Sequence, residues 1–479
     1  MNIQSVGQVV FEFLGPARVE VEAVAEQFSS DAGLVPIREF DRRLGWTEGF
    51  AAQIRDGRCG GRHTILEMVR QRVFGILAGY EDQNDHDTLR SDGVFKLIAG
   101  RSPDGLDLAS QPTLSRLENA VTVGDLFGMR DWFLDRFVEG FESEPARVTL
   151  DVDTMDDPVH GQQQLALFHD YYKQDQYQVR VTTCAENDQV VLPTLLLGNA
   201  SAKLGAADEW VPIITRLRSR FPGVAVHLRG DSGFGGGEEY RVLESLPNVT
   251  YTMGFAMNDK LKELAQAHRE EAEAAQAATG QPQLRYLLLK EYQSKYWDAP
   301  KTVVVKTEVT AHSSSQRAIV TNHPDAAGDP EGAYRAYALR GESENRNKEL
   351  KCDLCLDRLS DHRFMANFFR VHLHCLAHNL VARLRHVVAR HAPPAAEADP
   401  DPPATPCDSE VMRRKRHNDR RRTDRLAQAQ PNTWRMLVIK VAARVVVSCR
   451  RVRIELSSTW PNLNYLRRAA LAVAAGLSK

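Results

Sequence analysis

The chain has 479 residues, of which 43% are hydrophobic and 26% are charged, and its formal net charge is −2 at pH 7. This is the composition of a globular protein with enough chain for a large core and, by length, roughly three domains. No run approaches the roughly 18 apolar residues of a membrane span and no secretory pattern opens the chain, while seven scattered cysteines fit a reducing cytoplasm rather than a disulfide-rich secreted protein.

The first 145 residues predict a helical region. The segments RHTILEMVRQRVFGILAGY (62–80) and TVGDLFGMRDWFLDRFV (122–138) repeat apolar residues at the period of an amphipathic helix. Between them, SQPTLSRLEN (110–119) places Ser and Thr ahead of Leu and Glu, which is typical of a capped helix start.

From residue 146 to 255 the pattern changes to strands. RVTLDVD (147–153) and YQVRVTT (177–183) alternate polar and apolar residues, and the apolar run QVVLPTLLL (189–197) follows them. A helix (207–221), a strand (224–231), a second helix (238–246) and a last strand (249–255) come next. This order favours an α/β fold with a mixed sheet.

Residues 256–325 interrupt this alternation. A charged, alanine-rich helix (260–279) leads into three strand-like runs, LRYLLLKEY, KTVVVKTEVTAH and QRAIVTN, so we expect a β-rich insertion. Helical patterns resume at 331 and continue to about 391, within a segment we place at 326–391.

The last part of the chain is basic. A Pro/Ala/Asp linker (392–406) and the cluster RRKRHNDRRRTDR (413–425) form one segment (392–430), and the strand-like WRMLVIKVAARVVVSCRRVRIEL (434–456) lies in the next (431–479). From Met412 onward, 17 Lys and Arg face three acids, a charge of +14, so the preceding residues carry −16. Such a cluster attracts phosphate groups, although a solvated arm is the alternative.

Three acids from separate segments stand at positions suited to chemistry. Asp151 and Asp153 project from one face of the LDVD strand, because strand side chains repeat every two residues. Asp231 ends the strand in HLRGDSGF at a glycine-containing turn. Each is by itself more often a turn or cap residue than a ligand.

The third acid lies in YALRGESENRNKELK (337–351). On a helix, Tyr337, Arg340, Glu344 and Lys351 fall within a stripe about 60° wide, whereas Glu342 and Glu349 fall more than about 100° away. Geometry therefore selects Glu344, although ordinary Glu/Lys pairing on a solvated helix is the alternative. Three hard oxygen ligands suit a pair of Mg²⁺ ions, which clamp the attacking and leaving oxygens of a phosphodiester displacement, and the neighbouring Arg340, Lys351 and Tyr337 suit the DNA backbone.

Other groupings are weaker. Cys352, Cys355, His374 and His378 follow a zinc-ligand order, but the two histidines recur at helical spacing in an apolar segment, where core histidines are common. GDSGFGGG (230–237) lacks the spacing of a phosphate-binding loop, and its serine has no evident His/Asp partner. His160, in DPVHGQQ, suits either a DNA contact or a turn.

The spacing Tyr337-(2)-Arg340-(3)-Glu344-(6)-Lys351 resembles the Y-R-E-K signature of DDE transposases of bacterial insertion sequences. LDVD with DDPVHGQQ (156–163), LRGDSGF (228–234) and SQPTLSRLEN resemble further blocks of one subfamily, so the resemblance covers roughly residues 40 to 460. It implies an RNase H-like mixed sheet flanked by helices and interrupted by the β-rich insertion. It further implies that residues 1–145 bind the terminal inverted repeats and that the basic C-terminal tail adds phosphate contacts.

The resemblance also implies roles for single residues. Asp153, Asp231 and Glu344 correspond to the DDE triad that holds two Mg²⁺ ions, or Mn²⁺ in their place. Relatives carry a Thr two residues after the first Asp, whereas this chain has Thr154 directly after it, so Asp151 remains an alternative to Asp153. Some members stack a flipped base on a tryptophan of the insertion, where this chain has Trp297; a partly buried Trp that anchors the β element is the alternative.

We therefore expect a cytoplasmic bacterial enzyme that cleaves the ends of an insertion sequence and joins them to target DNA. Its partners would be double-stranded DNA and a second copy of the chain in the synaptic complex. The alternatives are a related metal-dependent nuclease or resolvase without strand transfer, and a DNA-binding protein whose acids are inactive.

Overall fold

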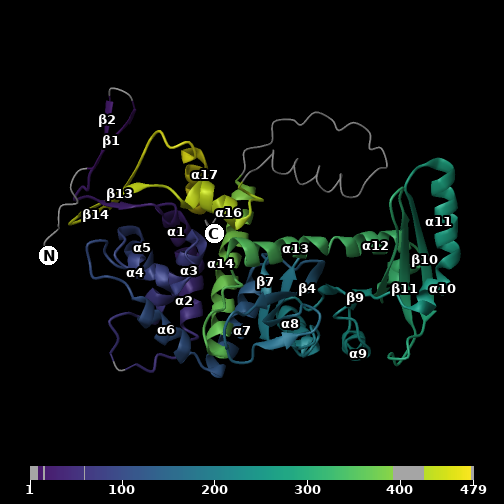
Figure 1. Cartoon of the computed structure of the whole chain (residues 1–479). Coiled ribbons are helices and arrows are strands. Elements are labelled where there is room, and N and C mark those ends of the chain that lie inside the picture. Colours follow the sequence, from purple (N-terminus) through teal and green to yellow (C-terminus); the bar gives the residue numbers. More distant parts are fainter. Residues whose placement is uncertain (1–8, 15–16, 59, 392–425, 476–479) are drawn as a thin grey trace.

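Short strands open the chain, ahead of the helices that the sequence predicts there. The computed structural model describes residues 9–14, 17–58, 60–391 and 426–475 (Figure 1). β1 (Val9–Leu14) pairs with β2 (Ala17–Val21) as an antiparallel hairpin, and β3 (Gln27–Ser29) pairs with a strand near the C-terminus. The expectation of a wholly helical N-terminal region was wrong for these residues, although ARVEV in β2 alternates apolar and polar residues as a strand does.

Helices fill the chain from residue 34 to residue 139. Thr64 and Glu67 form a reciprocal capping box that starts α3, and Gly79, with φ of 87°, ends it. The helices are α1 (Leu34–Leu44), α2 (Trp46–Ala51), α3 (Ile65–Ala78), α4 (His86–Leu89), α5 (Gly93–Ala99), α6 (Gln111–Ala120) and α7 (Val123–Glu139).

A nine-stranded mixed sheet forms the centre of the molecule. Its order is β10-β11-β12-β9-β8-β4-β6-β5, with β7 also paired to β6. β4, β8 and β9 run parallel to one another, and the remaining neighbours are antiparallel. The first strands and their helices are β4 (Arg147–Pro158), β5 (Leu167–His169), β6 (Gln174–Cys184), β7 (Val190–Leu196), α8 (Ala206–Arg220), β8 (Ala225–Gly230), α9 (Gly237–Ser245) and β9 (Val249–Phe255).

The β-rich segment predicted at 256–325 continues this sheet rather than forming a separate one. β12 pairs with β9 from Ala318 opposite Phe255 to Thr321 opposite Thr252. The elements are α10 (Asp259–Leu264), α11 (Gln266–Thr279), β10 (Gln283–Tyr292), β11 (Lys301–Val309) and β12 (Ser314–Thr321).

Three helices return the chain across the sheet. α12 (Pro330–Ala338) and α13 (Gly341–Lys348) are separated by two residues but run on as one rod, which ends in a π-helical turn at Glu349–Asp353 (Figure 1). α14 (Phe364–Arg390) then crosses the middle of the molecule, between the N-terminal helices and the sheet (Figure 1).

The C-terminal segment begins with helix where the sequence predicts strand. Trp434 is fully buried at the end of α16 (Pro431–Trp434), and a π-helical turn at Arg435–Ile439 follows. β13 (Ala443–Ser448) pairs with both β14 (Arg451–Leu456) and β3, and α17 (Leu463–Ala475) completes the described chain. The linker at 392–406 and the basic cluster at 413–425 lie outside the described residues.

Two apolar cores lie on the two faces of the sheet. The first joins the N-terminal helices, α14, the C-terminal elements and sheet residues such as Val179 and Val190. The second packs Val148, Leu150 and Val152 of β4 against α8, α9 and the base of the insertion. Among the described helices, none combines the length and apolar character needed to cross a lipid bilayer.

Candidate active site

The parallel pairing of β4 and β8 brings two acids side by side. Val152 of β4 lies opposite Gly230 of β8 as the last matched pair of the two strands. Asp153 is the next residue of β4, and Asp231 directly follows the end of β8; neighbouring strands lie about 4.8 Å apart. Two acids that are distant in the sequence therefore meet at one edge of the sheet.

Helix α13 approaches the same edge. Arg340 Nη1 lies 3.3 Å and Asn347 Nδ2 3.1 Å from the same oxygen, Oδ2 of Asp153. These residues lie about one turn before and one turn after Glu344, so the exposed Glu344 projects from the helix surface that faces Asp153.

The pKa of Asp153 depends on the charged residues around it. Burial raises the pKa of Asp153 to about 6; Arg340 opposes this rise, and the negative charges of Asp231 and Glu344 add to it. The three acids therefore share one field and repel one another.

Asp151 has a different setting. Arg229 of β8 holds both of its carboxylate oxygens, at 2.6 and 2.8 Å, and also donates to the carbonyl oxygen of Ala336 in α12. Burial raises the pKa of Asp151, and the hydrogen bonds and charge of Arg229 lower it. This buried pair ties two strands to the helix rod, and it leaves Asp153 as the acid of β4 that faces Asp231 and Glu344.

The cations named from the sequence lie around the acids. The Arg340 guanidinium lies 5.9 Å from the ring centre of Tyr337. Lys351 Nζ lies 2.9 Å from Asp156 Oδ1 and 2.8 Å from the Asp156 carbonyl oxygen, further along β4. The π-helical turn carries Lys351, so the helical stripe is less regular than predicted but still faces β4.

On the side of the rod away from Glu344, Glu349 is buried among charged and polar side chains. Glu349 accepts hydrogen bonds from Arg385 at 2.8 Å and contacts His378 at 3.0 Å, both on α14. Burial raises the pKa of Glu349, and Arg385, His378 and Arg346 outweigh that effect and hold the pKa well below its usual range. Glu342 is exposed and hydrogen-bonded to Asn345.

The sequence did not single out several residues that the structure brings to this edge. Asn347 contacts Asp153. Gly254 of β9 lies close to Tyr337 and Ser232: a Cβ atom on Gly254 would sit 2.8 Å from the Tyr337 hydroxyl and 2.9 Å from the Ser232 amide nitrogen. A glycine directly before the end of a strand was the available signal for this close approach.

An aromatic hairpin tip also adjoins the acids. Tyr171 is 83% and Phe168 52% exposed, and the Tyr171 and Tyr172 rings lie 5.0 Å apart. Gln174, just after the tip, donates to Asp156 Oδ2 at 3.3 Å, the acid that also holds Lys351. The string FHDYY between two strand patterns was the signal in the sequence.

Trp297 is buried within the insertion. Its ring lies 5.0 to 5.9 Å from the rings of Phe255, Tyr240 and Tyr292, and the residue is 7% exposed. Stacking a base on Trp297 would require this ring cluster to open, so its role there remains a prediction.

The two histidines of the zinc-like order have protein partners. His374 contacts the Leu354 carbonyl oxygen at 2.8 Å, His378 contacts Glu349, and both rings are buried in α14. Burial lowers the pKa of His374 to about 3, so the ring is neutral in the core. His160 is exposed after the end of β4.

The described residues do not form a closed metal cage: no group of three or more His, Cys, Asp or Glu side chains among them is arranged to hold an ion. The residues nonetheless fit a divalent cation in their chemistry. Asp153, Asp231 and Glu344 offer hard oxygen donors, and their mutual repulsion is the interaction that such an ion relieves. In the metal-free protein, Arg340 and Asn347 partly perform that role at Asp153.

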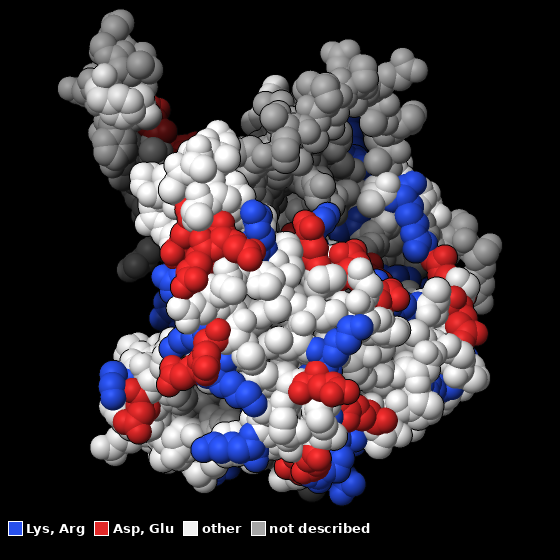
Figure 2. Space-filling model, turned by 90° about the vertical axis from the view of Figure 1, so that its right-hand side faces the viewer, with Lys and Arg blue, Asp and Glu red and all other residues white. Residues whose placement is uncertain are grey.

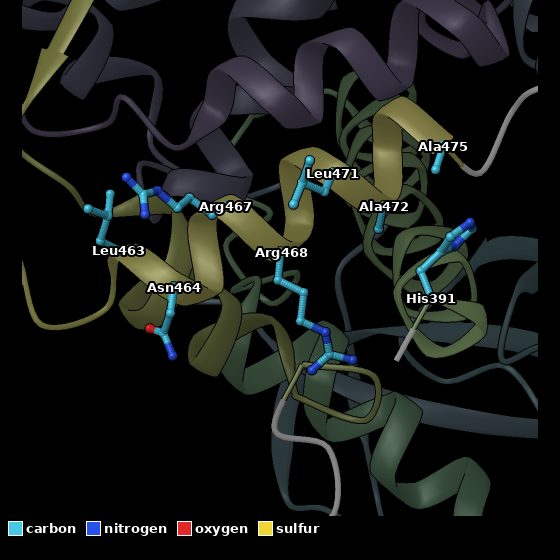
Figure 3. Close-up of a pocket in the computed structure, with 8 residues that line it drawn as sticks. All are labelled: His391, Leu463, Asn464, Arg467, Arg468, Leu471, Ala472 and Ala475. Atoms are coloured by element: carbon cyan, nitrogen blue, oxygen red, sulfur yellow. The ribbon is translucent and has the colours of Figure 1, made fainter. Parts of the chain in front are cut away.

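One described cavity is lined by none of these acids. It has a volume of about 570 Å³ and is lined by His391 and seven residues of α17, among them Arg467 and Leu471 (Figure 3). The residues that line it include no acid, and none of the three acids predicted from the sequence is among them.

Comparisons with known proteins add a family assignment. The family model described as transposase DDE domain group 1 matches residues 11–400. Among solved structures, the cryo-EM synaptic complex of piggyBac transposase with hairpin DNA is similar over 93% of this chain and 85% of that chain, with 12% identity and a TM-score of 0.38. No curated protein matches the chain significantly.

Proposed function

Because the chain belongs to the transposase DDE domain group 1 family, we propose that it cleaves the ends of a bacterial insertion sequence and joins them to target DNA by a cut-and-paste route. The observation that supports this proposal is the meeting of Asp153, Asp231 and Glu344 from β4, β8 and α13. The sheet with its helices then corresponds to an RNase H-like core of the Y-R-E-K class.

In this proposal the three acids hold two Mg²⁺ ions, which Mn²⁺ can replace. When bound, such ions stabilise charge on the attacking and leaving oxygens of a phosphodiester displacement. Asp153 lies on β4 and Asp231 directly follows β8, so these two acids form the sheet side of the site, and Glu344 completes it from α13.

The neighbouring polar residues then bind the DNA strand. Arg340 is paired with Asp153. If the three acids held a divalent ion, the planar guanidinium of Arg340 would be available for bidentate contact with a backbone phosphate. Lys351 adds a point charge further along β4, and Tyr337 adds a hydroxyl group. Bases next to the scissile phosphate meet the exposed aromatic tip at Tyr171, where stacking contributes about 1–3 kcal/mol per base.

The test compares two glutamates of one helix. We expect Glu344→Gln to abolish Mg²⁺-dependent cleavage of a plasmid that carries the gene with its native flanking DNA, while end binding is retained. Glu342→Gln, two residues away and exposed, should cleave like the wild type. Cleavage retained by Glu344→Gln would remove Glu344 from the site.

A second assay separates transposition from simple nuclease activity. A DNA end supplied already cut, with a free 3′-OH, should be joined to target DNA by the wild type in the presence of Mg²⁺. Cleavage without joining would indicate the nuclease or resolvase alternative, and neither reaction would indicate a DNA-binding protein with inactive acids. Because two transposon ends must be paired, we also expect the active complex to contain at least two copies of the chain.

A further inference from the structure

A second cavity, in the helical region, is lined by arginines. It has a volume of about 520 Å³ and lies between the α2–α3 loop, the end of α4 and the start of α6. Four arginines line it: Arg58, Arg62, Arg90 and Arg116. Asp107 is the acid among its described lining residues.

Much of this positive charge is not neutralised within the described chain. Neither Arg62 nor Arg116 has a described carboxylate within ion-pair distance, and Arg116 donates to Thr113 Oγ1 at 3.1 Å. Arg90 lies only within 4.0 Å of Asp107, with both side chains more than 40% exposed. Arg58 is paired with Asp56 at 2.7 Å.

The remaining lining groups are suited to an oxyanion. Ser110 and Thr113 place two hydroxyl groups 3.2 Å apart at the start of α6, and the Ser110 side chain makes no capping bond to the helix backbone. The Nδ1 atom of His63 is buried without a hydrogen-bond partner. Burial lowers the pKa of His63; the charges of Arg101, Arg62 and Arg58 lower it further, and that of Glu67 opposes them.

The position of the cavity points to nucleic acid. α6 and α13 lie on opposite sides of α14 (Figure 1), so the cavity is well separated from the acids. On the face that carries the insertion, acidic and basic side chains are interspersed, and the blue Lys and Arg side chains do not gather into one patch (Figure 2). A phosphate group would therefore meet more closely gathered positive charge at the cavity than on this face.

We propose that this cavity seats a backbone phosphate of DNA bound by the same molecule, with Arg62 and Arg116 as its main contacts. This inference rests on the proposed function, because it assumes that the chain handles DNA. The contact is to phosphate and is therefore independent of base sequence, so it sets where the duplex lies and not which end is chosen.

The experiment measures binding without catalysis. Wild type and the double variant Arg62→Ala/Arg116→Ala bind a fluorescent random-sequence duplex of roughly 40 base pairs in EDTA over a range of salt concentrations. We expect the double variant to bind at least about tenfold more weakly at 0.1 M salt and to reduce the log–log salt slope by about 2. The Arg62→Lys/Arg116→Lys variant keeps both charges and should restore most of the slope.

Controls identify the source of any effect. Arg42→Ala/Arg241→Ala removes two exposed, ion-paired charges outside the cavity and should leave the slope nearly unchanged. An unchanged slope in the Arg62/Arg116 variant would overturn the inference. A second outcome would also overturn it: inorganic phosphate protects the wild type, but not the variant, against thermal unfolding, while the salt slope of DNA binding is the same for both. The cavity would then be a site for a small anion. Neither outcome bears on cleavage, which is decided separately by Glu344→Gln.

Discussion

Two carboxyl groups of β4, at Asp153 and Asp157, lie where ionisation is disfavoured. Burial, opposed by Arg340, raises the pKa of Asp153 to about 6. Burial, reinforced by Asp357, raises the pKa of Asp157 to about 8, and both of its oxygens lack a hydrogen-bond partner. Both groups are therefore less stable as carboxylates in the folded protein than in the unfolded chain.

This predicts that removing the charge of Asp153 stabilises the metal-free protein. The pKa of Asp153 is about 6 in the folded protein and 3.8 as its ordinary value. As pH rises from about 4 to about 6, the unfolded chain therefore loses this proton more readily than the folded protein does, and the free energy of unfolding falls. Above about pH 6 this loss of stability stays constant. Asp153→Asn should raise the free energy of unfolding by about 1–3 kcal/mol near pH 7.5, with no difference near pH 4. Urea unfolding at both pH values measures this, and a destabilised variant at about pH 7.5 would contradict it.

Asp157 supplies the matched comparison. Asp157→Asn should also stabilise the protein, because its pKa is raised in the same direction; the gain should grow from about pH 4 to about pH 8 and stay constant above that. Only Asp153→Asn should abolish DNA cleavage and the stabilisation that Mg²⁺ gives to the wild type. Equal loss of cleavage in Asp157→Asn would add Asp157 to the catalytic machinery.

At the scale of elements, α13 is held in place from its far side. Glu349 is buried against Arg385 and His378 of α14, and Glu344 faces the acids about one and a half turns earlier. Glu349→Ala leaves the Arg385 charge buried without its main partner, so we expect a loss of about 3–5 kcal/mol in the free energy of unfolding. Chemical denaturation measures it, with the exposed Glu342→Ala as the control; equal effects of the two substitutions would show that the buried cluster does not anchor the helix.

Hydrophobic periodicity predicted the strands of the sheet centre correctly, but it predicted the wrong element at residues 434–439. The runs at 147–153, 177–183, 224–231 and 249–255 form β4, β6, β8 and β9, because each has a clear strand period. At 434–439 the alternation of apolar residues predicted a strand, but the segment is helical. Trp434 and Leu437 are buried there in the core that contains the N-terminal helices.

The candidate site was predictable in part for a similar reason. Helical spacing selected Glu344 over Glu342 and Glu349 from local geometry alone. The meeting of Asp153 with Asp231 depends on the parallel register of β4 and β8, and the capture of Asp151 by Arg229 depends on the same pairing. Nothing in the sequence of one strand states which strand lies beside it.

At the scale of the whole molecule, α14 joins parts that the sequence separates. Of its 27 residues, 20 are buried, and they pack against α3, α6 and α17 on one side and β7 on the other. A fragment of residues 146–391 would expose this apolar surface. We expect it to aggregate or to unfold without cooperativity, as measured by thermal melting, whereas the full chain should unfold cooperatively; a soluble, cooperatively folded fragment would contradict this expectation.

The unbroken hydrogen-bonded ladder from β10 to β4 has a mechanical consequence. Gly254 lies on β9, between β12 of the insertion and the edge where Asp231 and Tyr337 meet. A force applied to the hairpin of β10 and β11 would therefore be carried through backbone hydrogen bonds toward β8 and β4, the two strands that position Asp231 and Asp153.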